Sequence, residues 1–159
     1  MADESIKRAA QEYLAERVNE EGLTYEQSLN REAAIALAPL VWKKVTQSVF
    51  AMCDEWNAET KENTLTCKET MMGDLRVRCA GRAHQMVVRF EAAKRLVRID
   101  NTAREDFEPK VVLSIEGYET PSGQRDARLM RNKEVVNLNP LILGQLRALA
   151  GLSRRADGK

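Results

Sequence analysis

Residues 75–100 read LRVRCAGRAHQMVVRFEAAKRLVRID, and apolar and polar side chains alternate through three segments of this stretch. The apolar positions are Leu75, Val77 and Cys79, then Met86, Val88 and Phe90, then Val97 and Ile99. A period of two is typical of strands with one face buried and the other in water. The segments are joined by short connections such as Ala92–Lys94, which favour antiparallel neighbours. This stretch therefore predicts an antiparallel meander.

The same alternation continues toward the C-terminus. Val111, Leu113 and Ile115 form a further apolar set, Arg125–Asn132 is strand-like, and Glu134–Asn137 is a candidate for a last short strand. Gly73-Asp74 and Thr120–Gly123 have the composition of tight turns. The sheet is therefore expected to have five to six strands.

Helical periodicity flanks the predicted sheet. Ala2–Asn19 carries apolar residues at three- and four-residue steps, and Gly22 is expected to stop that helix. A second helix is expected over Asn30–Thr60, kinked at Pro39, with an apolar stripe from Trp42 to Trp56. Asn139-Pro140 is expected to open a C-terminal helix that ends at Gly151.

Together these patterns predict an α+β fold, with N-terminal helices, one of them long, packed on a curved antiparallel meander and followed by a C-terminal helix. The chain has 159 residues and a net charge of +1, which suits one domain over residues 1–152 with a flexible polar tail over 153–159. The acidic start lacks the basic and apolar regions of a signal peptide, so a cytoplasmic location is expected.

Most catalytic and cofactor chemistries lack the residues they need. His84 is the sole histidine, the three cysteines match no metal or redox spacing, and no glycine-rich phosphate loop is present. We therefore predict no catalytic residues, no metal and no cofactor. The cysteines Cys53, Cys67 and Cys79 are interpreted as small apolar side chains.

Charge is distributed unevenly along the chain. Residues 1–62 carry 7 bases and 12 acids, whereas residues 63–159 carry 18 bases and 12 acids. Alternation places Arg76, Arg78, Arg89 and Arg98 on the exposed face of the predicted sheet, where they could bind an anion or a nucleic-acid backbone. The alternative is a solvated face whose arginines are neutralised by nearby acids, Glu91, Asp100, Glu116 and Glu119.

Three hypotheses for function follow. The first is a non-enzymatic binding or protein-interaction module that forms a homo-oligomer through its helical layer, with Phe50 and Tyr13 as interface residues, because Phe50 lies off the apolar stripe. The second is the anion or nucleic-acid binder. The third is a small-ligand carrier or enzyme with a pocket between sheet and long helix, lined by residues such as Met86 and Phe90. No membrane partner is expected.

Overall fold

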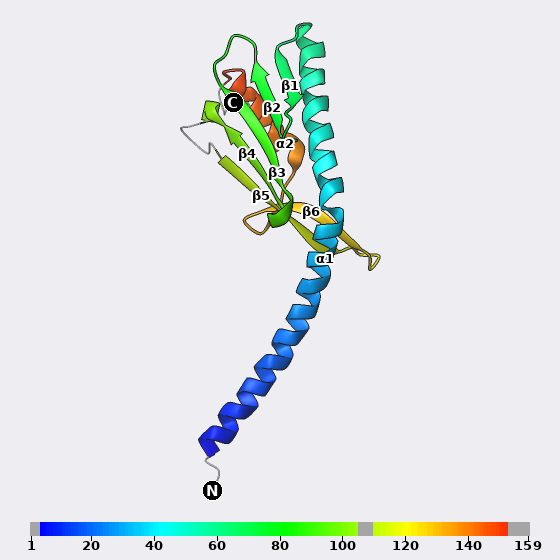
Figure 1. Cartoon of the computed structure of the whole chain (residues 1–159), viewed down its shortest axis with the longest axis vertical. Helices are drawn as coiled ribbons and strands as arrows, with labels where there is room; N and C mark the ends of the chain where they lie inside the picture. Colours follow the sequence, from blue (N-terminus) through cyan, green and yellow to red (C-terminus); the bar gives the residue numbers. More distant parts are fainter. Residues whose placement is uncertain (1–3, 105–109, 153–159) are drawn as a thin grey trace.

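A seven-stranded antiparallel sheet and two α-helices build the fold (Figure 1). The computed structural model describes residues 4–104 and 110–152, and leaves the side chains of 18–24 and 104 undescribed. Two single-turn 3₁₀ helices, η1 (Ala92–Lys94) and η2 (Thr102–Arg104), follow strands β3 and β4. The main elements are α1 (Glu4–Thr60), β1 (Leu65–Glu69), β2 (Leu75–Cys79), β3 (Gln85–Glu91), β4 (Leu96–Asn101), β5 (Lys110–Glu119), β6 (Arg125–Arg131), β7 (Glu134–Val135) and α2 (Leu138–Leu149).

The sheet is the predicted meander. Its strands lie in sequence order from β1 to β7, and every neighbouring pair is antiparallel. The α+β class, the long N-terminal helix, the antiparallel sheet and the C-terminal helix are therefore confirmed. The strand count is higher than predicted, because β1 was missed: its sequence, LTCKE, offers only two apolar residues, Leu65 and Cys67, to mark a buried face.

The two predicted N-terminal helices are one continuous helix, so the expected stop at Gly22 is wrong. The helix α1 has 57 residues and runs through both Gly22 and Pro39. A glycine ends a helix only where the backbone turns left-handed. Within a continuing helix it costs about 1 kcal/mol relative to alanine, which neighbouring turns can offset.

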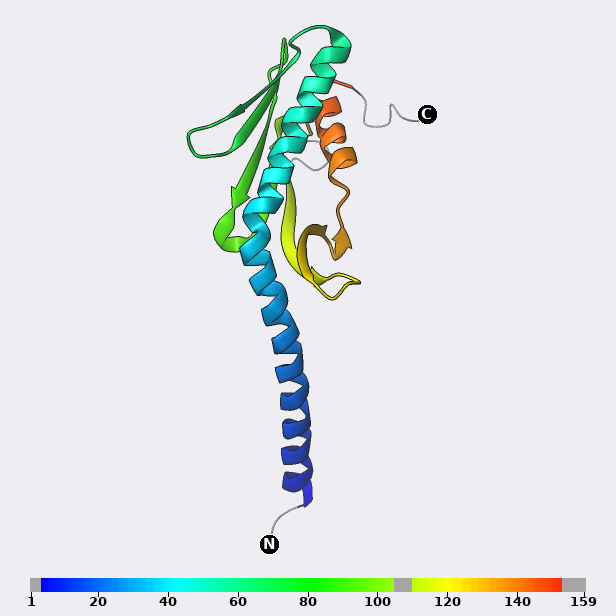
Figure 2. The same ribbon diagram turned by 90° about the vertical axis from the view of Figure 1, so that its right-hand side faces the viewer.

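Both helices pack on one face of the sheet, which curls around them (Figure 2). From α1 the core takes Val45, Val49 and Cys53, which belong to the predicted stripe. From α2 it takes the apolar face Ile142, Leu146 and Leu149. The sheet supplies the alternating set that was predicted from its sequence: Leu75, Val77, Met86, Val88, Val97, Ile99, Val111, Leu113 and Ile115.

The helix α2 begins two residues earlier than Asn139-Pro140 indicates. Leu138 is its first residue and Asn137 precedes it, so Asn139 lies within the first turn and is not the cap. The helix is tied to β4 by a buried polar pair: Asn101 Nδ2 donates to the Gln145 carbonyl oxygen at 3.1 Å and to Gln145 Oε1 at 2.9 Å. Gly151 follows the helix with φ +78°, as a terminating glycine does.

Two predictions fall partly or wholly outside the described residues. The loop predicted over Thr102–Lys110 contains 105–109, and the polar tail predicted over 153–159 lies beyond the last described residue.

Candidate functional site

A concave surface of about 710 Å³ lies on the outer face of the β1–β2 hairpin. We call it the basic groove. Four bases line it and only one acid does, so it carries a net positive charge. Its lining residues are Thr66, Lys68, Glu69, Thr70, Met71, Arg76, Arg78, Cys79, Ala80 and Arg82.

Strand register explains why the bases gather there. Lys68 on β1 lies directly opposite Arg76 on β2, and Thr66 lies opposite Arg78. Like charges placed opposite each other across two strands destabilise a sheet unless other groups neutralise them. The side chains of Lys68 and Arg76 form no hydrogen bond and no ion pair within the described part of the chain. Arg78 is held by Gln85, whose Oε1 accepts from Nε at 3.3 Å and from Nη2 at 3.2 Å.

Arg82 enters the groove from the loop after β2. Its guanidinium lies over Gly151, so close that a Cβ on this glycine would be 2.6 Å from three guanidinium atoms. The positive charge therefore lies beside the C-terminal end of α2, where the helix dipole is negative. Sequence reasoning missed Lys68 and Arg82, because β1 was not recognised and Arg82 lies outside the alternating segments.

The structure divides the four arginines that were predicted to act together. Arg76 and Arg78 line the basic groove, whereas Arg89 and Arg98 lie opposite each other on β3 and β4. Arg89 Nε lies 3.2 Å from Asp74 Oδ2, and Arg98 Nε lies 2.8 Å from Glu91 Oε1. Acids therefore neutralise this second arginine pair, as the solvated-face alternative expects. The bases that line the groove have no ion-pair partner among the described residues.

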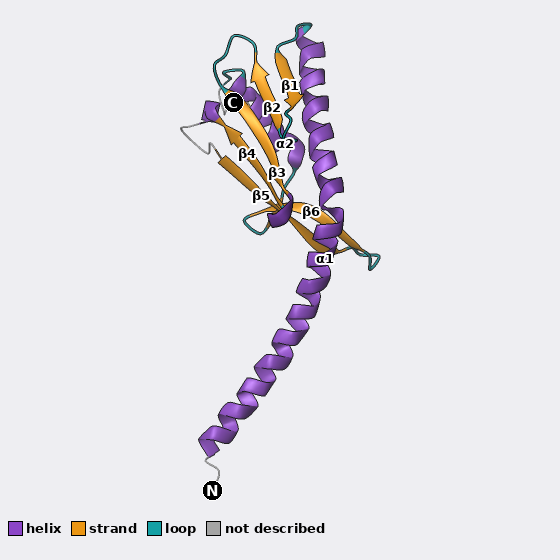
Figure 3. Ribbon diagram, viewed as in Figure 1, coloured by secondary structure: helices purple, strands orange, loops and turns teal. Residues whose placement is uncertain are grey.

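The N-terminal half of α1 is the second candidate surface. We call residues 4–28 the arm, which projects below the sheet in Figures 1, 2 and 3, with another element beside it only at its last turn, where Arg125 contacts Glu26. At 1.5 Å per residue it is about 37 Å long. The large apolar side chains that the structure describes in the arm, Ile6, Tyr13, Leu14 and Tyr25, are all more than half exposed, and Tyr13 is 62% exposed.

The two predicted interface residues, Tyr13 and Phe50, differ in their surroundings. Tyr13 lies on the exposed arm. Phe50 lies in the packed half of α1, where it is half-buried and packs against the core.

The arm leaves the body of the protein at a tight junction. Arg125 on β6 grips α1 through two bonds: Nη1 donates to Asn30 Oδ1 at 2.6 Å, and Nη2 donates to Glu26 Oε2 at 3.1 Å. Gly117 on β5 lies against the backbone of Asn30 so closely that no side chain would fit. The arm is therefore anchored at one end.

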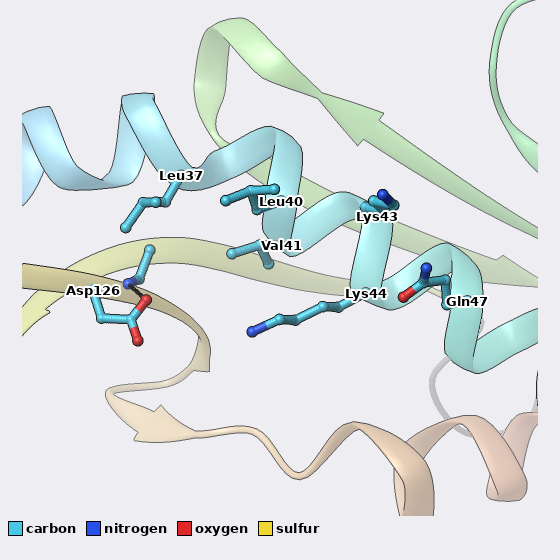
Figure 4. Close-up of a pocket in the computed structure, with 8 residues that line it drawn as sticks. Leu37, Leu40, Val41, Lys43, Lys44, Gln47 and Asp126 are labelled. Atoms are coloured by element: carbon cyan, nitrogen blue, oxygen red, sulfur yellow. Dashed lines mark hydrogen bonds between the residues drawn. The ribbon is translucent and has the colours of Figure 1, made fainter.

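The two residues that were predicted to line an internal pocket, Met86 and Phe90, are packed against other side chains. Met86 is fully buried, and Phe90 stacks on Trp42 with ring centroids 5.6 Å apart. A smaller surface cavity of about 270 Å³ lies between α1 and β6 (Figure 4). Figure 4 shows Leu37, Leu40 and Val41 beside Lys43, Lys44 and Asp126 there, with no cluster of converging polar groups.

Other predicted features are in ordinary surroundings. His84 is exposed, with Nδ1 3.1 Å from Thr102 Oγ1. Among residues 4–104 and 110–152, no three His, Cys, Asp or Glu side chains group to hold a metal ion. No described helix contains an 18-residue stretch that is apolar enough to cross a membrane.

Comparison with known proteins returned no match to a family model, to a curated protein or to a solved structure. The function of this chain therefore has to be inferred from its own surfaces, the arm and the basic groove.

Proposed function

We propose that this protein is a non-enzymatic interaction module that self-associates by pairing its arm with the arm of a second copy. The observation that carries the proposal is the exposure of Ile6, Tyr13 and Leu14 on the part of α1 that extends beyond the sheet (Figure 1). Isolated helices are marginal in water and gain most of their stability from packing of an apolar face.

Charge favours a second copy in antiparallel orientation. Residues 1–17 carry three bases and four acids, whereas 18–32 carry one base and four acids. A parallel pair would align the two strongly acidic segments. An antiparallel pair places Lys7 and Arg8 of one copy beside the acidic segment of the other, which suits a symmetric dimer.

Sedimentation velocity tests this proposal. The double variant Tyr13→Glu/Leu14→Glu should sediment as a monomer at concentrations where the parent is a dimer, because four charges would enter the contact. Ala15→Glu is the control, since it adds a glutamate on the opposite face of the same helix and replaces no residue of the proposed contact. A parent that is monomeric at every concentration, or a double variant that dimerises like the parent, would overturn the proposal.

A second candidate function is supported by the basic groove: binding of a phosphate-rich polyanion such as a nucleic-acid backbone. The specific observation is that Lys68 and Arg76 face each other without a neutralising partner in the described residues. An anion between them would relieve this repulsion, and arginine can grip a phosphate at two points.

Heparin-column retention tests the groove. Lys68→Gln/Arg76→Gln should elute at clearly lower salt than the parent, because bound phosphates release counterions in proportion to the bases involved. Arg89→Gln/Lys94→Gln removes the same charge outside the groove and should elute close to the parent. Equal losses in the two variants would show only a net-charge effect and would refute a defined site.

A further inference from the structure

The last turns of α1 are fixed beside the edge strand β1 by a two-point hydrogen bond. Asn57 Nδ2 donates to the Leu65 carbonyl oxygen, and the Leu65 N–H donates to Asn57 Oδ1, both at 2.8 Å. Figure 1 shows β1 running beside this end of the helix. The amide of Asn57 thus replaces the strand partner that edge strand β1 lacks on this side, and fixes its position along α1.

This arrangement brings two cysteines together. Cys53 precedes Asn57 by one helical turn and lies on the same face of α1. Cys67 follows Leu65 by two residues and lies on the same face of β1. Each cysteine is therefore displaced from the Asn57–Leu65 bond in the same direction, by one helical turn in α1 and by two residues in β1, and both side chains pack at the core between these elements. Cys53 is 2% exposed, whereas Cys67 is half-buried.

We propose that Cys53 and Cys67 form an oxidation site, in which a small-molecule disulfide converts the two thiols into an intramolecular disulfide that joins α1 to β1. The sequence spacing of the cysteines gives no hint of this pair, because the two residues belong to different elements and β1 is hard to recognise.

Proton distribution within the pair sets the order of the steps. The interaction between the two thiols lowers the pKa of Cys67, while the same interaction and burial raise the pKa of Cys53. Cys67, the more accessible sulfur, is therefore the nucleophile. Its thiolate attacks the small disulfide, forms a mixed disulfide and releases one small thiol.

Cys53 completes the reaction. It loses its proton and attacks the Cys67 sulfur, which releases the second small thiol and closes the Cys53–Cys67 bond. Two protein thiols are oxidised and one small disulfide is reduced to two small thiols, so atoms and electrons balance.

The bond would hold one wall of the basic groove. The outer face of β1 carries Thr66 and Lys68, which line the groove, while Cys67 points from the opposite face toward α1. Closing the short chain segment between Cys53 and Cys67 also restricts the unfolded chain, so the oxidised protein should melt at a higher temperature.

Cys79 provides an internal control. It is buried and its Sγ lies 3.8 Å from the Ala80 carbonyl oxygen. It is a diagonal neighbour of Cys67 across the β1–β2 pair, since Cys67 lies opposite Val77. A poorly defined thiol cluster would therefore give Cys67–Cys79 bridges as well.

The experiment treats the full folded chain with oxidised glutathione and counts free thiols before and after. The count should fall from three to one, with one Cys53–Cys67 peptide in a non-reducing digest and a raised melting temperature that dithiothreitol reverses. The Cys79→Ser variant should form the same bridge as the parent and so lose both of its thiols. In the Cys53→Ser variant the reaction should end at the mixed disulfide between Cys67 and glutathione.

Three results would overturn the proposal: three free thiols after treatment, a bridge that includes Cys79, or a stable glutathione adduct on Cys67 of the parent. The parent protein alone decides between these outcomes, so the proposal remains testable if Cys53→Ser fails to fold.

Discussion

Replacing Gly117 with alanine should loosen α1 from the sheet at the base of the arm. A Cβ at this position would overlap the carbonyl oxygen of Asn30 and lie 2.9 Å from the carbonyl carbon and Cα of that residue. These are backbone atoms of a helix, which Arg125 also holds in place, so no side-chain rotation relieves the overlap. The whole helix has to move away from β5.

The sign of the effect distinguishes this account from the ordinary behaviour of glycine. In an unobstructed strand, Gly→Ala stabilises a protein by about 0.5–1 kcal/mol, because glycine loses more freedom on folding. Forcing an extra carbon into a packed contact costs about 1–3 kcal/mol. We expect the obstruction to dominate, with a net cost of up to about 2.5 kcal/mol, which lowers the melting temperature by up to about 10 °C for a domain of this size.

Thermal unfolding followed by circular dichroism measures this difference. Gly81→Ala serves as the reference, since a Cβ there meets no atom within 4 Å and its cost comes from its φ of +76° alone. A Gly117→Ala protein as stable as the parent, or more stable, would refute the close approach of α1 to β5.

Three further changes probe the packing and the ion pairs. Asn101→Ala should lower the free energy of unfolding by about 2–3 kcal/mol in urea, because it leaves the buried amide of Gln145 without its partner. Trp42→Ala should cost about 3 kcal/mol in the same assay, since it removes the stack on Phe90. Arg89→Ala should cost under about 1 kcal/mol at any salt concentration, because its ion pair with Asp74 is exposed.

The sequence predicts the parts of this fold that periodicity controls. Strands β2 to β6 and the apolar stripe of α1 follow from alternation and helical spacing, since each element has one buried face. The strand β1 fails this test, because it has only two apolar residues, Leu65 and Cys67, and its pairing depends on β2 and on Asn57. Gly22 fails for a different reason: composition does not show whether a glycine adopts the left-handed conformation that ends a helix.

Only part of the candidate site could be predicted from the same periodicity. Alternation correctly placed Arg76, Arg78, Arg89 and Arg98 on the outer face, but charge neutralisation depends on register. Asp74 lies in a turn, 15 residues from Arg89 in sequence, and only the folded hairpin brings its carboxylate to that guanidinium. Lys68 reaches Arg76 through a strand that the sequence does not reveal.

The two halves of α1 differ in what can hold them helical. In the packed half, Pro39 removes a backbone hydrogen bond at a cost of about 3 kcal/mol, and burial of Val45 and Val49 returns about 1.5–3 kcal/mol for each side chain. The arm contains Gly22, which costs about 1 kcal/mol, and its large apolar residues gain nothing while they are exposed. Burial against the sheet therefore explains why the packed half of α1 is helical, but no burial within one copy explains the helicity of the arm. Pairing with a second copy would supply the missing burial, which is why helicity of the arm and dimer formation should be lost together on dilution.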